Sequence, residues 1–137
     1  MNVNSVVNHC LSLSFFELQH FAGKNFNVVY DYIKANHKNT NPNSLLVGTI
    51  FTCIATNGSL SQKEWEFIMQ FIGGYSYNEA LETAGSFLNE EARNIVRSLV
   101  ATFPGNVSEA YLSMCIAILA VDGRVDGEEI EFLKSLY

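Results

Sequence analysis

The side chains of this chain that are best suited to chemistry are acids near its C-terminal end. Asp122, Asp126 and Glu129 follow a long apolar run within a few residues of one another. Carboxylate oxygens are hard ligands that suit calcium-like divalent cations. A less acidic version of the same stretch occurs earlier, where Asn57 and Glu64 hold matching positions. These five residues are our candidate metal ligands, and the two turns could share one ion if they meet in space.

A structural interpretation of the same residues stands beside this one. Ser61 and Glu64, like Asp126 and Glu129, have the spacing of a capping box. In that motif the first side chain accepts a hydrogen bond from a backbone amide, and the glutamate caps the first residue in return. Both interpretations, ion binding and helix capping, are kept as hypotheses.

A complete EF-hand loop is excluded. The spacing from Gly123 to Glu129 matches the second half of such a loop. Its first two ligand positions would then fall on Ile118 and Ala120, which carry no side-chain oxygen. Any ion held here therefore needs water or ligands from elsewhere in the chain.

Each candidate turn joins two predicted helices, and the arrangement occurs twice. Residues 45–72 align with residues 110–137, so that an apolar helix, a glycine and an amphipathic helix recur in register. Gly58 and Gly123 can take the positive φ that ends a helix. We interpret this as an internal duplication.

The duplication extends to the whole chain in our interpretation. We predict one domain, 1–137, built from repeats at approximately 9–72 and 75–137. Apolar residues recur with a period near 3.6 throughout, which predicts a compact all-α bundle of seven or eight helices in two similar halves and no sheet. The predicted helices are 11–21, 26–33, 45–55, 62–72, 77–88, 92–103, 110–120 and 130–137. Those at 45–55 and 110–120 are apolar almost all round, so we expect them to be central and packed together.

Finer details of these helices are also predicted. Residues 22–24, with Gly23 among them, are expected to break the chain between the first two helices. Ser108 is expected to cap the apolar helix that follows, and Ile95 to lie on a buried face. Trp65 is expected to be a core anchor.

Composition and charge narrow the possible functions. The net charge is −6 and the 8 Lys and Arg residues are scattered, so no basic stripe favours nucleic acid. No phosphate loop, nucleophile elbow or paired Cys and His suggests an enzyme. Cys10, Cys53 and Cys115 are too dispersed for a disulfide framework. The chain lacks a basic signal-peptide start and an apolar run long enough for a bilayer, so we expect a cytoplasmic protein without a membrane span.

The repeated motif, Ala-x-Asp/Asn-Gly-x-Val/Leu-Asp/Ser-x-x-Glu, resembles that of the TerB-like family of bacterial tellurite-resistance and stress proteins. The matching residues are Ala120, Asp122, Gly123, Val125, Asp126 and Glu129 and, less closely, Ala55, Asn57, Gly58, Leu60, Ser61 and Glu64. The resemblance implies an all-helical, stress-related domain whose acidic surface holds a divalent cation. The alternative is a helical module that binds a protein partner and whose acidic turns only cap helices.

Overall fold

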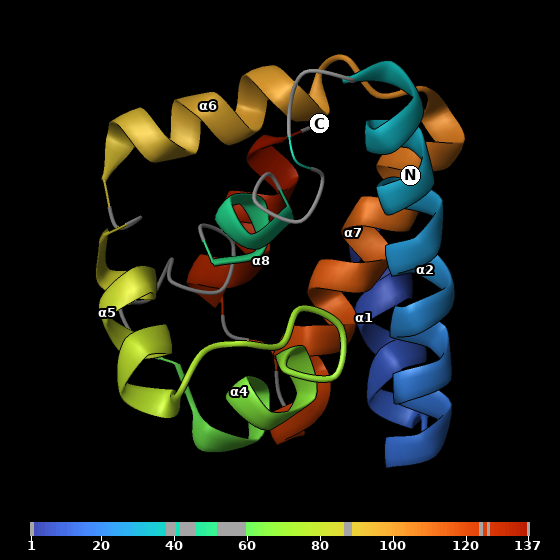
Figure 1. The fold of residues 1–137 in the computed structure, drawn as a ribbon. Coiled ribbons are helices and arrows are strands. Elements are labelled where there is room, and N and C mark those ends of the chain that lie inside the picture. The colour runs from blue at the N-terminus through green and yellow to red at the C-terminus, as the bar shows by residue number, and fades with distance from the viewer. Residues whose placement is uncertain are drawn as a thin grey trace.

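The computed structural model describes residues 2–37, 41, 46–51, 60–86, 89–123, 125 and 127–136 (Figure 1). The elements with defined bounds are α1 (Val3–Ser12), α2 (Phe15–Asn36), α4 (Gln62–Ile68), α5 (Tyr77–Ser86), α6 (Glu90–Val100), α7 (Gly105–Leu119), the 3-10 helix η2 (Ala120–Asp122) and α8 (Gly127–Ser135). Residues 46–51 are helical as well. These described residues contain no strand, which confirms the predicted all-α fold.

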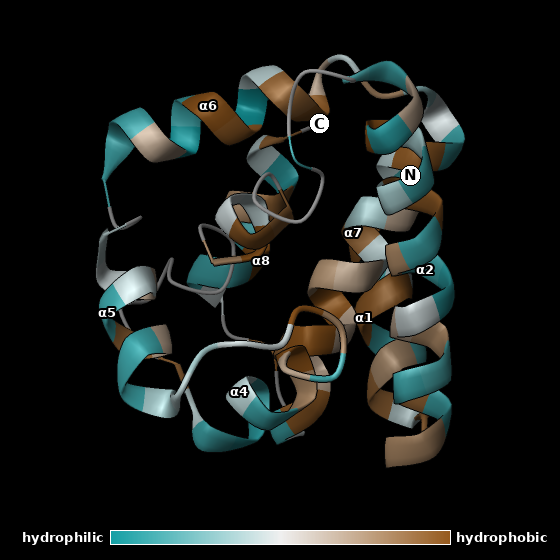
Figure 2. Cartoon of the chain, in the orientation of Figure 1, coloured by the Kyte–Doolittle hydropathy of each residue, from teal (hydrophilic) through white to brown (hydrophobic). Residues whose placement is uncertain are grey.

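Helix α7 forms the centre of the core. From Ala110 to Leu119 only Ser113 is not buried. Helix α2 runs along α7, and α1 also packs against α7 (Figure 1). In the hydropathy colouring α7 is largely brown, whereas α6 alternates between brown and teal (Figure 2). The all-round apolar pattern of α7 therefore reflects burial on every side.

The other predicted central helix meets α7 where the structure describes it. Leu46, Ile50 and Phe51 are buried in the same core. The Tyr111 hydroxyl donates a hydrogen bond to the Thr49 carbonyl oxygen across 3.2 Å. The predicted contact between the two apolar helices is confirmed for residues 46–51, and residues 45 and 52–55 lie outside the described part.

The first two predicted helices were placed wrongly. The break falls at Leu13 and Ser14, and α2 then continues through Gly23 without interruption. Ser14 sets this boundary, because its hydroxyl accepts from the Glu17 amide and the Glu17 carboxylate accepts from the Ser14 amide. Gly23 brings α2 close to Phe71, whose ring would lie 3.4 Å from an added Cβ.

Smaller differences follow from tertiary packing. Ile95, expected to be buried, is 59 % exposed, because Val96 and Val100 form the buried face of α6. Helix α7 begins after Pro104 without a side-chain cap, so Ser108 is not its N-cap. Helix α4 ends at Ile68, several residues earlier than predicted. Trp65 is partly buried as an anchor, and its indole N–H donates to the Tyr75 carbonyl oxygen at 2.9 Å.

Two cysteines of the described chain are buried. Cys10 lies on α1 and Cys115 on α7. Burial raises the pKa of the Cys10 thiol to about 11. Cys53 lies outside the described residues. Among the helices of the described chain, none combines the length and apolar character that a bilayer crossing requires.

Candidate functional site

The first candidate turn uses its glutamate as a helix cap. Glu64 accepts a hydrogen bond from the Ser61 amide through Oε1 at 2.9 Å, and the Ser61 hydroxyl accepts from the Glu64 amide at 3.0 Å. Glu64 is buried. The predicted capping box of α4 is therefore confirmed, and at least one carboxylate oxygen of Glu64 is turned toward backbone. Asn57 and Gly58, the other predicted residues of this turn, lie outside the described part.

The second turn contains the predicted left-handed glycine. Gly123 follows η2 with φ of 82°, and its amide donates to the Ala120 carbonyl oxygen at 2.9 Å. Asp122 is exposed beside it, whereas Glu129 is buried on α8. Asp126 lies outside the described residues. Glu129 thus resembles Glu64 in being buried within the first turn of the helix that follows its glycine.

Helix α4, which carries Glu64, contacts η2, which ends at Asp122. Within the described ranges, no group of three or more His, Cys, Asp or Glu side chains is placed to hold a metal ion. Of the predicted ligands that the structure describes, Glu64 and Glu129 are buried and Asp122 is exposed.

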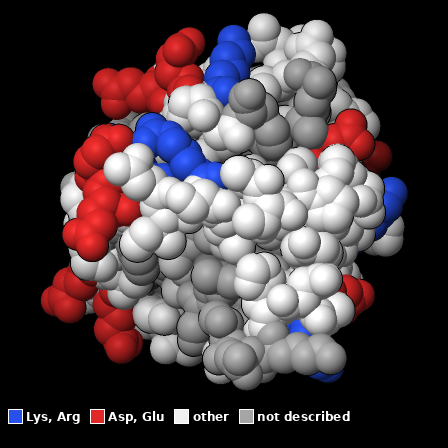
Figure 3. All heavy atoms as spheres, turned by 90° about the horizontal axis from the view of Figure 1, so that it is seen from above, with Lys and Arg blue, Asp and Glu red and all other residues white. Residues whose placement is uncertain are grey.

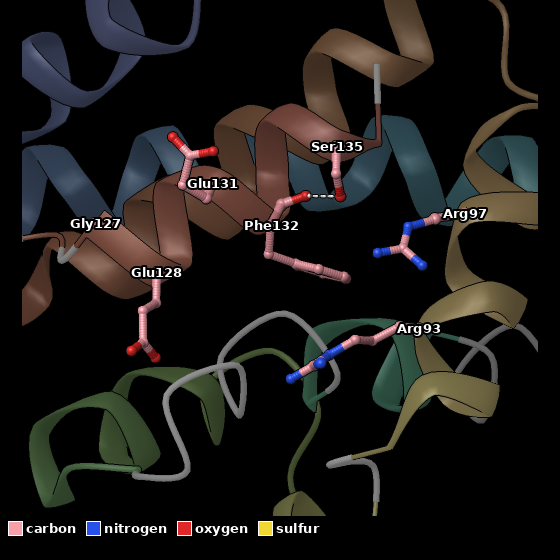
Figure 4. Close-up of a pocket in the computed structure, with 7 residues that line it drawn as sticks. All are labelled: Arg93, Arg97, Gly127, Glu128, Glu131, Phe132 and Ser135. Atoms are coloured by element: carbon pink, nitrogen blue, oxygen red, sulfur yellow. Dashed lines mark hydrogen bonds between the residues drawn. The ribbon is translucent and has the colours of Figure 1, made fainter.

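A hollow between α6 and α8 was not predicted. It has a volume of about 690 Å³ and is lined by Arg93, Arg97, Gly127, Glu128, Glu131, Phe132 and Ser135. Figure 4 shows both arginine side chains extending from α6 toward the ring of Phe132 on α8. The spacing of Arg93 and Arg97 by one helical turn places them on one face. The spacing of the two arginines can be seen in the sequence, but the sequence does not show that α8 lies opposite them.

A second unpredicted feature lies at the junction of α1 and α2. The side chains of Leu11, Phe15 and Phe16 are 42 %, 51 % and 81 % exposed, and we call these three residues the corner surface. Beside them is a hollow of about 430 Å³ lined by His9, Leu13, Phe16, Glu17, His20, Phe21 and Lys24. Phe15 and Phe16 are adjacent in one helix, so their side chains cannot both face the core of the protein. This adjacency is the sequence signal for an exposed aromatic ring here.

Charge is distributed unevenly over the surface. Seen from above, acidic side chains follow one edge of the molecule and a small group of basic side chains lies beside them (Figure 3). The view shows no continuous basic stripe, as the scattered Lys and Arg residues predict.

No protein-family model, curated protein or solved structure matches this chain. Function is therefore inferred from its own residues and from the motif that resembles the TerB-like family.

Proposed function

We propose that this chain is a TerB-like, stress-related helical module that binds an amphipathic helix of a partner protein at the corner surface. The observation that carries the proposal is the 81 % exposure of Phe16, beside two other exposed apolar side chains and an adjacent hollow. The rings of Phe15 and Phe16 lie 6.4 Å apart, and exposed apolar side chains that lie together are typical of interaction sites. An amphipathic helix would bury these rings by laying its apolar face into the hollow.

The polar rim of the hollow favours acidic groups on the partner. Lys24 is a cation, and the rings of His9 and His20 lie in the same lining. The one acid in the lining, Glu17, already caps α2, because its Oε1 atom accepts from the Ser14 amide at 2.9 Å. The partner helix that we propose therefore carries apolar anchors flanked by aspartate or glutamate.

A selection from a library of random helical peptides tests this proposal. The purified chain and its Phe16→Ser variant are each used as bait, with Ile95→Ser as the matched control. Ile95 is 59 % exposed on a different helix, so its loss removes apolar surface without touching the corner. We expect acidic amphipathic peptides to be enriched on the wild type and on Ile95→Ser, and to be lost on Phe16→Ser.

Two results would contradict the proposal. The first is the same peptide pool on the wild type and on Phe16→Ser. The second is a dimer, seen by sedimentation velocity, that Phe16→Ser dissociates, because a second copy of the chain would then be the occupant.

A divalent cation at the second turn is the other candidate function, and the contact between α4 and η2 favours it. That contact places the helix that carries Glu64 against the 3-10 helix that ends at the exposed Asp122. Binding to the folded state alone stabilises it by about 2.7 kcal/mol at a hundredfold excess over Kd. We expect calcium to raise the melting temperature of the wild type, and to raise that of the Asp122→Asn variant less. The control is Asp31→Asn, which removes an exposed acid of α2 and should respond to calcium as the wild type does. An unchanged melting temperature with millimolar calcium and magnesium would end this hypothesis.

A further inference from the structure

The hollow between α6 and α8 brings two guanidinium groups to one aromatic ring. The guanidinium carbon of Arg93 lies 5.9 Å from the centroid of the Phe132 ring, and that of Arg97 lies 5.7 Å from it. Phe132 itself is buried. Figure 4 shows both arginine side chains reaching from α6 toward this ring. Cation–π contact with the ring holds both guanidiniums at the hollow.

The charges of the two arginines are only partly neutralised nearby. Glu90 contacts both, with Arg97 Nη1 at 2.9 Å from its Oε1 and Arg93 Nη1 at 3.9 Å from its Oε2. Arg97 also donates to Asn94 at 2.9 Å. Within the described part of the chain, the long ion pair with Glu90 is the only polar interaction of the Arg93 side chain. Two positive charges therefore share one negative charge.

The two other acids of the lining form no ion pair with Arg93 or Arg97 in the described chain. In Figure 4 the Glu131 carboxylate points to the opposite side of α8 from the arginines, whereas the Glu128 carboxylate points to the side of α8 on which Arg93 lies. The Ser135 hydroxyl donates to the Phe132 carbonyl oxygen at 2.6 Å, so its proton is already used.

We propose that this hollow binds a small organic carboxylate. One carboxylate group matches the single uncompensated positive charge of Arg93, Arg97 and Glu90, and its two oxygens suit the planar fork of a guanidinium. The apolar body of the ligand lies against Phe132. A phosphate dianion fits less well, because it carries one negative charge more than the net positive charge of Arg93, Arg97 and Glu90. This site is separate from the corner surface and does not depend on it.

Benzoate is the test probe, with benzyl alcohol as its neutral match and inorganic phosphate as the alternative oxyanion. Backbone amide signals are followed by NMR during titration of the full chain. We expect benzoate to shift signals of α6 and α8 with saturation, and benzyl alcohol to leave them unchanged at the same concentrations. Arg93→Gln and Arg97→Gln should each weaken benzoate binding about tenfold or more, the effect of losing a charge-assisted hydrogen bond.

Lys134→Gln is the matched control. Lys134 is an exposed cation on α8 that does not line the hollow, so its loss changes the net charge equally. We expect benzoate affinity to be unchanged in this variant. If Arg93→Gln fails to fold, Arg93→Lys keeps the charge but removes the planar fork, and it should still weaken binding.

Several outcomes would overturn the proposal. Equal shifts with benzyl alcohol would mean that the hollow recognises only apolar bulk. Stronger binding of phosphate than of benzoate would assign a different anion. Equal weakening by Lys134→Gln and Arg93→Gln would reduce the effect to overall charge.

Discussion

Gly123 shows how a single residue defines the second turn. Its φ of 82° lies in the left-handed region, which side chains with a Cβ atom disfavour. An added Cβ would meet no atom within 4 Å. Any cost of a substitution here therefore comes from the backbone conformation and not from a steric clash with the surroundings.

Replacing Gly123 by Val should lower the free energy of unfolding by about 1 to 3 kcal/mol, the usual cost of a strained backbone conformation. Gly85→Ala is the control, because Gly85 lies within α5 and an added Cβ there also meets nothing within 4 Å. That variant should be stabilised by about 0.5 to 1 kcal/mol. Urea unfolding measures both, and an unchanged Gly123→Val would show that another residue forms the turn.

The Glu17 carboxyl at the start of α2 makes the stability of the fold depend on pH. Hydrogen bonds from the Ser14 backbone and then the Ser14 side chain lower the pKa of this exposed carboxyl from its ordinary value of 4.5. A carboxyl with a lowered folded-state pKa stabilises the fold fully above its unfolded pKa. This contribution is lost as pH falls from 4.5 through the lowered value. The same direction holds for Glu79, which is hydrogen-bonded to Ser76 at the start of α5.

Glu17→Gln should therefore reduce stability at neutral pH and make the loss of stability below pH 4.5 less steep. Melting temperatures across the acidic range measure the effect. Glu66→Gln serves as the control, since Glu66 is exposed on α4 and does not cap a helix. A steep acid loss that is identical in Glu17→Gln and Glu66→Gln would assign the pH dependence to other carboxyls.

At the scale of elements, the sequence pattern predicts that helices exist better than it predicts where they end. Apolar spacing correctly indicates most helices of the described chain, although it misses α1, and the Ser61 and Glu64 spacing correctly predicts the cap of α4. The pattern fails near Gly23 because a glycine that allows close packing looks the same in sequence as one that ends a helix. The exposure of Ile95 likewise depends on which neighbour covers α6, which periodicity does not specify.

Gly23→Ala distinguishes a continuous α2 from a broken one. Within a helix this change should stabilise the chain by about 0.5 to 1 kcal/mol, because alanine loses less backbone entropy on folding. The new methyl would lie 3.4 Å from the Phe71 ring, an ordinary contact distance. Gly74→Ala, at φ of 104°, should instead destabilise. A destabilised Gly23→Ala would support a break at this position.

The candidate sites also differ in how well the sequence predicts them. The capping glutamates and Gly123 belong to local motifs, so short-range spacing finds them. The hollow with Arg93 and Arg97 lies between α6 and α8, and the corner surface lies at the junction of α1 and α2. Predicting either site requires knowing which helices meet. The spacing of Arg93 and Arg97 and the adjacency of Phe16 to Phe15 are visible in the sequence, but the role of these residues depends on packing.

For the molecule as a whole, stability should depend mainly on α7. Ile116 is completely buried at the centre of the core. Ile116→Ala removes buried methyl groups and leaves a cavity, so it should cost about 2 to 5 kcal/mol. Ile95→Ala removes the same atoms from the surface and should change stability by less than about 0.5 kcal/mol. Similar urea midpoints for the two variants would contradict a core built around α7.

The rates at which Cys10 and Cys115 react with a thiol reagent can report how this fold opens. A thiol reacts as the thiolate, and the Cys10 thiol, with its pKa of about 11, is both protonated near neutral pH and shielded. Modification of Cys10 must therefore wait until α1 leaves its place against α7, whereas modification of Cys115 must wait for α7 itself. In a Cys53→Ser background, the ratio of the two labelling rates reports whether the N-terminal helix opens alone or only together with the centre of the domain.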